Sequence, residues 1–67
     1  MSMIREIVLR RVPVEGWYTI IQQGQPGSPR DELTRFGPAK HKPTDRRLRA
    51  LQFRFFSGYK TDVIVEE

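Results

Sequence analysis

The chain has 67 residues and no cysteine, and its twelve Lys and Arg side chains outnumber its eight Asp and Glu side chains, for a net charge of +4. A domain of this size buries only about 60% of the surface that its unfolded chain exposes. The lack of cysteine excludes disulfide frameworks, zinc knuckles, iron–sulfur ligand sets and thiol nucleophiles. We therefore predict one small domain over residues 1–67, marginally stable or supported by a partner or a second copy.

The longest apolar run near the N-terminus, residues 7–9, is too short for a signal-peptide core or a membrane span. A hydrophobic content of 37% is enough for a globular fold, although 30% of the residues are charged. These features predict a cytoplasmic protein that does not enter a membrane.

The first predicted element is a β-hairpin. Residues 4–12 and 17–22 are rich in β-branched and aromatic side chains, and the residues between them include Pro13 and Gly16. Proline fixes a φ that suits a turn, and glycine can adopt the positive φ that a short loop requires. The break between the two strands therefore has a mechanism.

Residues 29–36 carry the strongest local helix signals. Ser28 suits an N-cap and Pro29 suits the first helical position, where a missing N–H costs nothing. Acidic side chains follow in the first turn, and Gly37 can end the helix. The sequence predicts a helix of two turns, followed by a mobile basic loop over residues 38–46.

Two interpretations compete for residues 44–56. As a helix, the segment has Thr44 as its cap and Gly58 as its terminator, with apolar side chains on one face at Leu48, Leu51 and Phe55. As a strand, a three-residue loop would place Arg54 opposite Asp62, among other favourable cross-strand pairs. We favour the strand and thus a second hairpin.

The predicted fold is therefore all-β, a small antiparallel four-stranded sheet or an SH3-like barrel, with one short helix near residues 29–36. The alternative is an α+β fold of order β-β-α-β, in which residues 44–56 are helical.

Positive charge is concentrated in the middle of the chain. Residues 24–54 hold eight basic and three acidic side chains, a net charge of +5, whereas the remaining residues carry −1. Such clusters neutralise phosphates, although a solvated basic face is the simpler interpretation. The predicted nucleic-acid or partner site comprises Lys40, His41, Lys42, Arg46, Arg47, Arg49, Arg54, Phe56 and Tyr59.

Aromatic side chains lie among these cations, and bases of single strands stack on such rings. A core this small needs large side chains, so we assign Phe53 and Phe55 to it. Phe56 and Tyr59 then remain as the binding platform, on the other face of the strand or at its turn.

The sequence contains no recognisable nucleophile motif, metal-ligand spacing or phosphate-binding glycine loop. We predict a non-enzymatic protein without cofactor or metal, whose basic segment contacts nucleic acid. The alternative is an accessory or inhibitor protein that binds another protein through the basic face, which would contact an acidic surface of that partner, or through an exposed strand edge. A ribonuclease that uses His41 and Tyr59 is a third, remote hypothesis.

Overall fold

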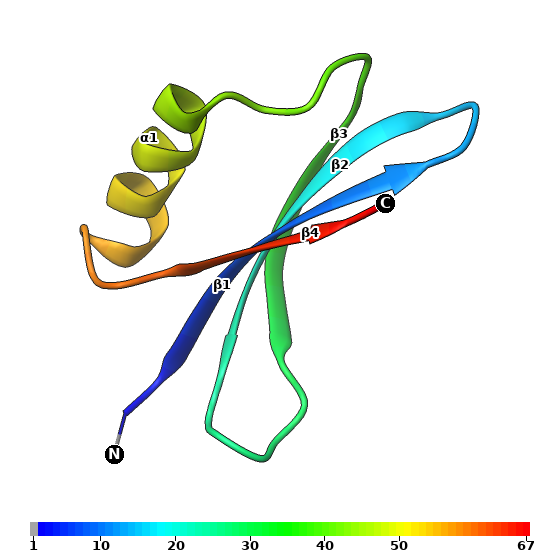
Figure 1. Cartoon of the computed structure of the whole chain (residues 1–67). Helices are drawn as coiled ribbons and strands as arrows, with labels where there is room; N and C mark the ends of the chain where they lie inside the picture. Colours follow the sequence, from blue (N-terminus) through cyan, green and yellow to red (C-terminus); the bar gives the residue numbers. More distant parts are fainter. Residues whose placement is uncertain (1) are drawn as a thin grey trace.

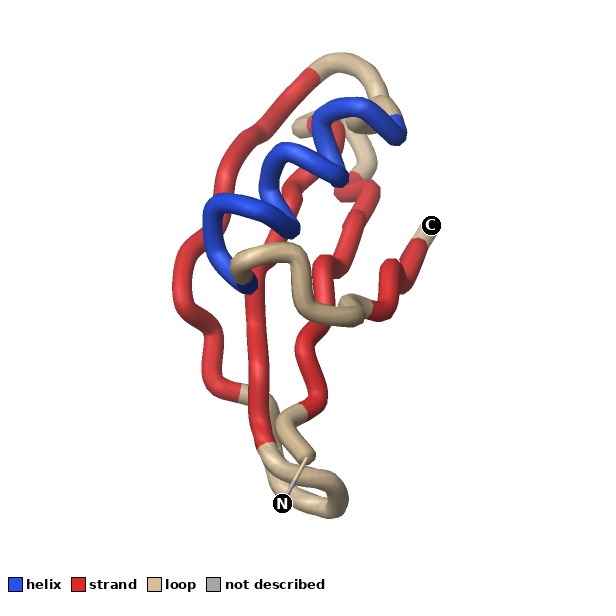
Figure 2. Tube along the Cα trace, turned by 90° about the vertical axis from the view of Figure 1, so that its left-hand side faces the viewer, coloured by secondary structure: helices blue, strands red, loops and turns tan. Residues whose placement is uncertain are grey.

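The computed structural model describes residues 2–67 and consists of a four-stranded sheet and one helix. The elements are β1 (Ile4–Val12), β2 (Gly16–Gly24), β3 (Asp31–Ala39), α1 (Asp45–Phe56) and β4 (Asp62–Glu66). The strand order is β3-β2-β1-β4, and α1 lies on one side of the twisted sheet (Figures 1 and 2). The predicted β character with one short helix is confirmed. The sheet is open, so the predicted barrel is not confirmed.

The predicted first hairpin is confirmed. β1 and β2 pair antiparallel over their whole length, from Ile4 opposite Gly24 to Val12 opposite Gly16. The β3 strand continues this antiparallel arrangement on the far side of β2. The fourth strand departs from it, because β4 runs parallel to β1. The sheet is therefore mixed, and the all-antiparallel prediction is wrong for β4.

The helix predicted over residues 29–36 is wrong, because residues 31–39 form β3. The predicted N-cap residue Ser28 lies in a turn instead, where it donates its backbone N–H to the Gln25 carbonyl at 3.1 Å. Pairing with β2 outweighs the weak helix preference of this segment, and Phe36 packs against the core. The β2–β3 pairing has two register irregularities, and at each of them β3 contains one residue more than the facing part of β2.

The strand predicted for residues 44–56 is also wrong, and the helical alternative is correct for this segment. The Thr44 side chain accepts a hydrogen bond from the Arg47 N–H at the N-terminus of α1, and Ser57 ends the helix in the left-handed conformation. Residues 44–56 form no hairpin with β4, because β4 pairs with β1. Arg54 and Asp62 are consequently not cross-strand neighbours. The observed order is β-β-β-α-β.

The hydrophobic core lies between α1 and the sheet. It is formed by apolar side chains of β1, β2 and α1, namely Ile7, Leu9, Trp17, Ile21, Leu51 and Phe56. Phe36, Leu48 and Phe55 pack against this cluster and are half-buried. Phe53 was predicted to be core and is 74% exposed, because it lies on the outer face of α1. In a strand, Phe53 would lie on the same face as Leu51. In a helix, side chains two residues apart point in nearly opposite directions, so Phe53 faces away from the core.

The face of the sheet turned away from α1 has a small buried centre. Val8 and Ile20 are cross-strand partners there and are both buried. Beside them, the largely buried Glu6 carboxylate accepts hydrogen bonds from Gln22 Nε2 at 2.8 Å and Arg30 Nε at 3.0 Å. Long hydrogen-bonded side chains therefore flank an apolar centre that α1 leaves uncovered.

The β1–β2 turn approaches the end of β3 closely at Gly16, which has φ +120°. A Cβ added there would lie 2.4 Å from the Ala39 carbonyl oxygen. This approach fixes the start of the loop that leads to α1.

We expect Gly16→Ala to lower the free energy of unfolding by about 1–3 kcal/mol, because it combines strain at positive φ with a backbone clash. Gly27→Ala is the matched control, since Gly27 also has a positive φ (+80°) but no atom within 4 Å of an added Cβ. Urea unfolding of both variants measures the difference. Equal losses of unfolding free energy in the two variants would show that the close approach of Gly16 to Ala39 does not contribute to the destabilisation.

Candidate functional site

Ion pairing divides the basic residues of the middle segment into two groups. Arg30 pairs with Glu6, and Arg35 pairs with Glu32 at 2.7 Å. The hydrogen bond from Arg35 lowers the pKa of the Glu32 carboxyl, so this acid stays ionised beside its partner. Within residues 2–67, no salt bridge involves the other basic side chains of the segment, which are Lys40, Lys42, Arg46, Arg47, Arg49 and Arg54.

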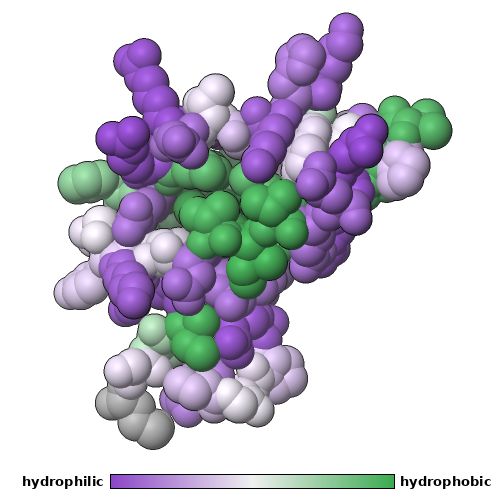
Figure 3. All heavy atoms as spheres, viewed as in Figure 1, coloured by the Kyte–Doolittle hydropathy of each residue, from purple (hydrophilic) through white to green (hydrophobic). Residues whose placement is uncertain are grey.

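These unpaired cations lie on α1 and on the loop before it, and all of them are exposed. The apolar face of α1 is turned to the sheet, so its other positions project into solvent. Figure 3 shows long hydrophilic side chains extending from the side of the molecule where α1 lies. The predicted basic surface thus exists in the fold, although a helix presents most of it instead of a strand.

Three of the cations lie over aromatic rings where α1 meets the sheet. Lys42 Nζ is 6.0 Å from the centre of the Trp17 ring. The Arg47 guanidinium is 5.5 Å from the Phe36 ring, and the Arg54 guanidinium is 5.4 Å from the Phe55 ring. We call this arrangement the cation–aromatic seam; it comprises Lys42, Arg47 and Arg54 with Trp17, Phe36 and Phe55.

The rings of the seam are themselves held by the core. Phe36 and Phe55 are in contact, with ring centres 6.0 Å apart, and both pack against the buried cluster. Each cation–ring contact contributes about 0.5–1 kcal/mol at an exposed site. The contacts also restrict the long side chains, so less conformational entropy is lost when a ligand binds the cations. The seam is therefore a partly ordered array of positive charge.

The aromatic side of the seam does not follow from the sequence pattern. Phe36 falls within the helix predicted over residues 29–36, and Trp17 falls within the first predicted hairpin, apart from the predicted site. The available strand signal was limited to residues 34–36, where the charged Arg35 lies between the β-branched Thr34 and the aromatic Phe36. It was weaker than the capping pattern at Ser28 and Pro29.

The remaining predicted site residues are dispersed. Lys40 and His41 are exposed in the loop between β3 and α1. Phe56 is only 4% exposed and belongs to the core, so it cannot serve as a platform. Tyr59 is exposed beyond the C-terminus of α1, and the Arg5 guanidinium lies 4.6 Å from its ring centre.

His41 and Tyr59 are not brought together. They flank opposite ends of α1, whose twelve residues span about 18 Å. No hydrogen bond of the His41 side chain is found in the described chain. The geometry therefore gives no support to the ribonuclease hypothesis.

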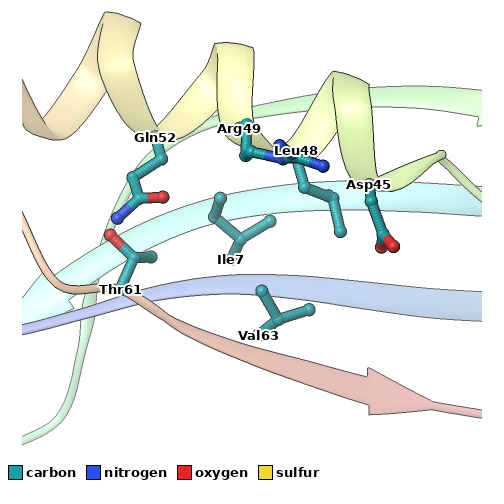
Figure 4. Close-up of a pocket in the computed structure, with 7 residues that line it drawn as sticks. All are labelled: Ile7, Asp45, Leu48, Arg49, Gln52, Thr61 and Val63. Atoms are coloured by element: carbon teal, nitrogen blue, oxygen red, sulfur yellow. The ribbon is translucent and has the colours of Figure 1, made fainter. Parts of the chain in front are cut away.

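A small groove lies on the other flank of α1, between the helix and β4. Its volume is about 250 Å³, with apolar side chains at its floor and polar side chains at its rim (Figure 4). The lining residues are Ile7, Asp45, Leu48, Arg49, Gln52, Thr61 and Val63. Arg49 thus lies on the groove side of the helix, apart from the seam.

Across residues 2–67, no helix is long and apolar enough to cross a membrane. The same residues contain no group of three or more His, Cys, Asp or Glu side chains that could hold a metal ion. Comparisons of the chain with protein-family models, with curated proteins and with solved structures found no match.

Proposed function

We propose that this protein binds nucleic acid through the cation–aromatic seam and the adjoining basic face of α1. The observation that carries the proposal is that Lys42, Arg47 and Arg54 lie over aromatic rings while no carboxylate pairs with them in the described chain. Cations in this state can exchange their counterions for phosphates, which is the main source of affinity in non-specific nucleic-acid binding.

The arrangement favours contacts with the phosphate backbone. Guanidinium groups donate to phosphate oxygens in a fixed fork, and those of Arg47 and Arg54 are kept in place by their rings. Arg46 adds a third guanidinium on the exposed face of the helix. Phe53 is the exposed ring nearest to these residues in sequence. We assign the stacking role to Phe53, because Phe56 is buried.

An acidic protein surface is the second candidate partner. The same unpaired cations would serve it, because carboxylates and phosphates are both bound by guanidinium forks. The two classes of partner differ in the salt dependence of binding, since only a polyelectrolyte releases a condensed counterion atmosphere.

We expect binding to a labelled oligonucleotide to weaken linearly in a plot of log affinity against log salt concentration. Fluorescence anisotropy from about 50 to 200 mM salt measures the slope. In the variant Arg46→Ala/Arg47→Ala, each lost phosphate contact should reduce the slope by about 0.9 for duplex and about 0.7 for single-stranded nucleic acid.

An unchanged slope and affinity in this double variant would remove these two arginines from the interface. The absence of binding to any nucleic acid at about 50 mM salt would instead contradict the proposal as a whole and leave the acidic protein surface as the partner.

A further inference from the structure

The turn between β1 and β2 combines a strained backbone with full exposure. Val14 follows Pro13 in this turn and has a φ of +73°. A β-branched residue seldom adopts this left-handed conformation, which glycine or asparagine normally supplies in a turn. The Val14 side chain is 108% exposed, so no packing within the fold offsets the strain. Strain of this kind persists where it serves binding, which makes the end of the hairpin a candidate contact surface.

Arg11 is an exposed, unpaired cation close to this turn. Strand alternation places it on the same face of β1 as the core residue Leu9, and therefore on the α1 side of the sheet. Within residues 2–67, its guanidinium makes no hydrogen bond or salt bridge. The preceding Arg10 lies on the opposite face and pairs with Glu66 at 2.7 Å. The two neighbouring arginines thus differ in both face and partner.

The end of the hairpin adjoins the cation–aromatic seam at two points. Trp17 is the cross-strand partner of Arg11, and its ring lies under Lys42 of the seam, 6.0 Å from Nζ. Gly16 approaches Ala39 so closely that an added Cβ would lie 2.4 Å from the carbonyl oxygen of Ala39. The hairpin end and the loop that begins after β3 therefore lie at the same end of the sheet (Figures 1 and 2). The positive surface of the seam continues onto β1.

The acidic residue of the turn is engaged on the other side of the sheet. The Glu15 carboxylate accepts a hydrogen bond from the Tyr18 hydroxyl at 2.5 Å. Tyr18 follows the core residue Trp17 in β2, so it lies on the face that α1 leaves uncovered. This hydrogen bond holds the Glu15 carboxylate towards that face. On the α1 side, the hairpin end presents the positive charge of Arg11.

We infer that the hairpin end is a second contact element for the nucleic acid, in which Arg11 binds a phosphate and Val14 packs against a neighbouring sugar. The nucleic-acid backbone alternates anionic phosphates with sugars that have apolar edges. A cation three residues from a fully exposed apolar side chain matches that alternation. The inference rests on the proposed function, because it extends the same ligand from the seam to the hairpin. Contacts of this kind position the ligand without reading its sequence.

The first test separates binding from stability at Val14. Val14→Gly removes the strain and the apolar side chain together, so it should raise Tm in thermal unfolding followed by circular dichroism. The same variant should bind a labelled oligonucleotide at least about threefold more weakly in anisotropy titrations. Val14→Ile is the matched control, because it keeps the strain and the apolar contact and should leave Tm and affinity unchanged. A merely structural role of Val14 does not combine a higher Tm with weaker binding.

The second test compares the two neighbouring arginines. Arg11→Gln should weaken binding about fivefold at low salt, and should reduce the slope of log affinity against log salt by about 0.9 for a duplex or about 0.7 for a single strand. Arg10→Gln makes the same change in charge one residue away and should leave the slope unchanged, because Arg10 is paired with Glu66. Titrations with a duplex and with a single strand show which form of nucleic acid reaches the hairpin.

Three outcomes would overturn the inference and leave the proposed function intact, provided that the wild type binds and Arg47→Gln/Arg54→Gln weakens binding. A higher Tm of Val14→Gly with unchanged affinity would show that the turn takes no part in binding. A Tm that does not rise would show that the turn is not strained. Equal slopes for Arg11→Gln and Arg10→Gln would confine the site to α1 and the seam. A wild type that binds neither form of nucleic acid would overturn the proposed function and this inference together.

Discussion

Leu51→Ala is expected to unfold this protein at moderate temperature. Leu51 is 1% exposed and is the helix residue at the centre of the packing between α1 and the sheet. Truncation of a buried leucine removes its transfer free energy and leaves a cavity, at a cost of about 2–5 kcal/mol. A chain of this length has a total stability of about 3–10 kcal/mol. Circular dichroism during thermal unfolding should show a loss of at least about 10 °C in Tm.

Phe53→Ala is the control for this prediction. It removes a larger side chain from the same helix, but from the exposed face. Alanine also has the higher helix propensity, so the free energy of unfolding should change by less than about 0.5 kcal/mol. Unfolding of both variants would mean that residues 45–56 are a strand, because Leu51 and Phe53 would then share its buried face.

Leu51 and Phe53 show which part of the fold can be predicted from the sequence. Both the helix and the strand interpretations of residues 44–56 explained part of the pattern. The spacing of Leu48, Leu51 and Phe55 fits a helix, whereas the cross-strand pairs of Arg54 and Phe53 fit a hairpin. Cross-strand pairs of this kind contribute only about 0.2–1 kcal/mol each. The capping groups at Thr44 and Ser57, together with burial of Leu51, favoured the helix.

The position of β4 could not be inferred from local patterns. A strand that follows a helix can pair with any open edge of the sheet, and the parallel pairing with β1 joins residues 56 positions apart. The first hairpin was predictable because its turn residues and both of its strands are adjacent in sequence. The sheet order, by contrast, depends on which apolar faces α1 can cover.

The candidate site was predicted in its charges but not in its architecture. The unpaired cations of α1 follow from composition, since three acidic residues cannot neutralise the local excess. Their placement over Trp17, Phe36 and Phe55 depends on tertiary packing between the helix and two strands. The loss of Phe56 from the site has the same origin, because the helical period turns it into the core.

Replacing the ring-stacked guanidinium groups is expected to abolish most nucleic-acid binding. The variant Arg47→Gln/Arg54→Gln lowers the net charge from +4 to +2 and removes two of the three cations of the seam. Loss of two phosphate contacts should reduce the affinity about thirtyfold at low salt. Anisotropy titrations with a single-stranded and a duplex oligonucleotide measure the effect. The fold should survive, because each cation–ring contact contributes only about 0.5–1 kcal/mol.

The matched control is Arg10→Gln/Arg35→Gln, which also brings the net charge to +2. Arg10 and Arg35 pair with Glu66 and Glu32, both at 2.7 Å, so their charges are already neutralised locally. We expect the control to lose less than about threefold in affinity, through weaker long-range attraction alone. Equal losses in the two variants would mean that net charge, and not the seam, determines binding. A larger loss of affinity in the control would indicate that nucleic acid binds the face of the sheet that α1 leaves uncovered.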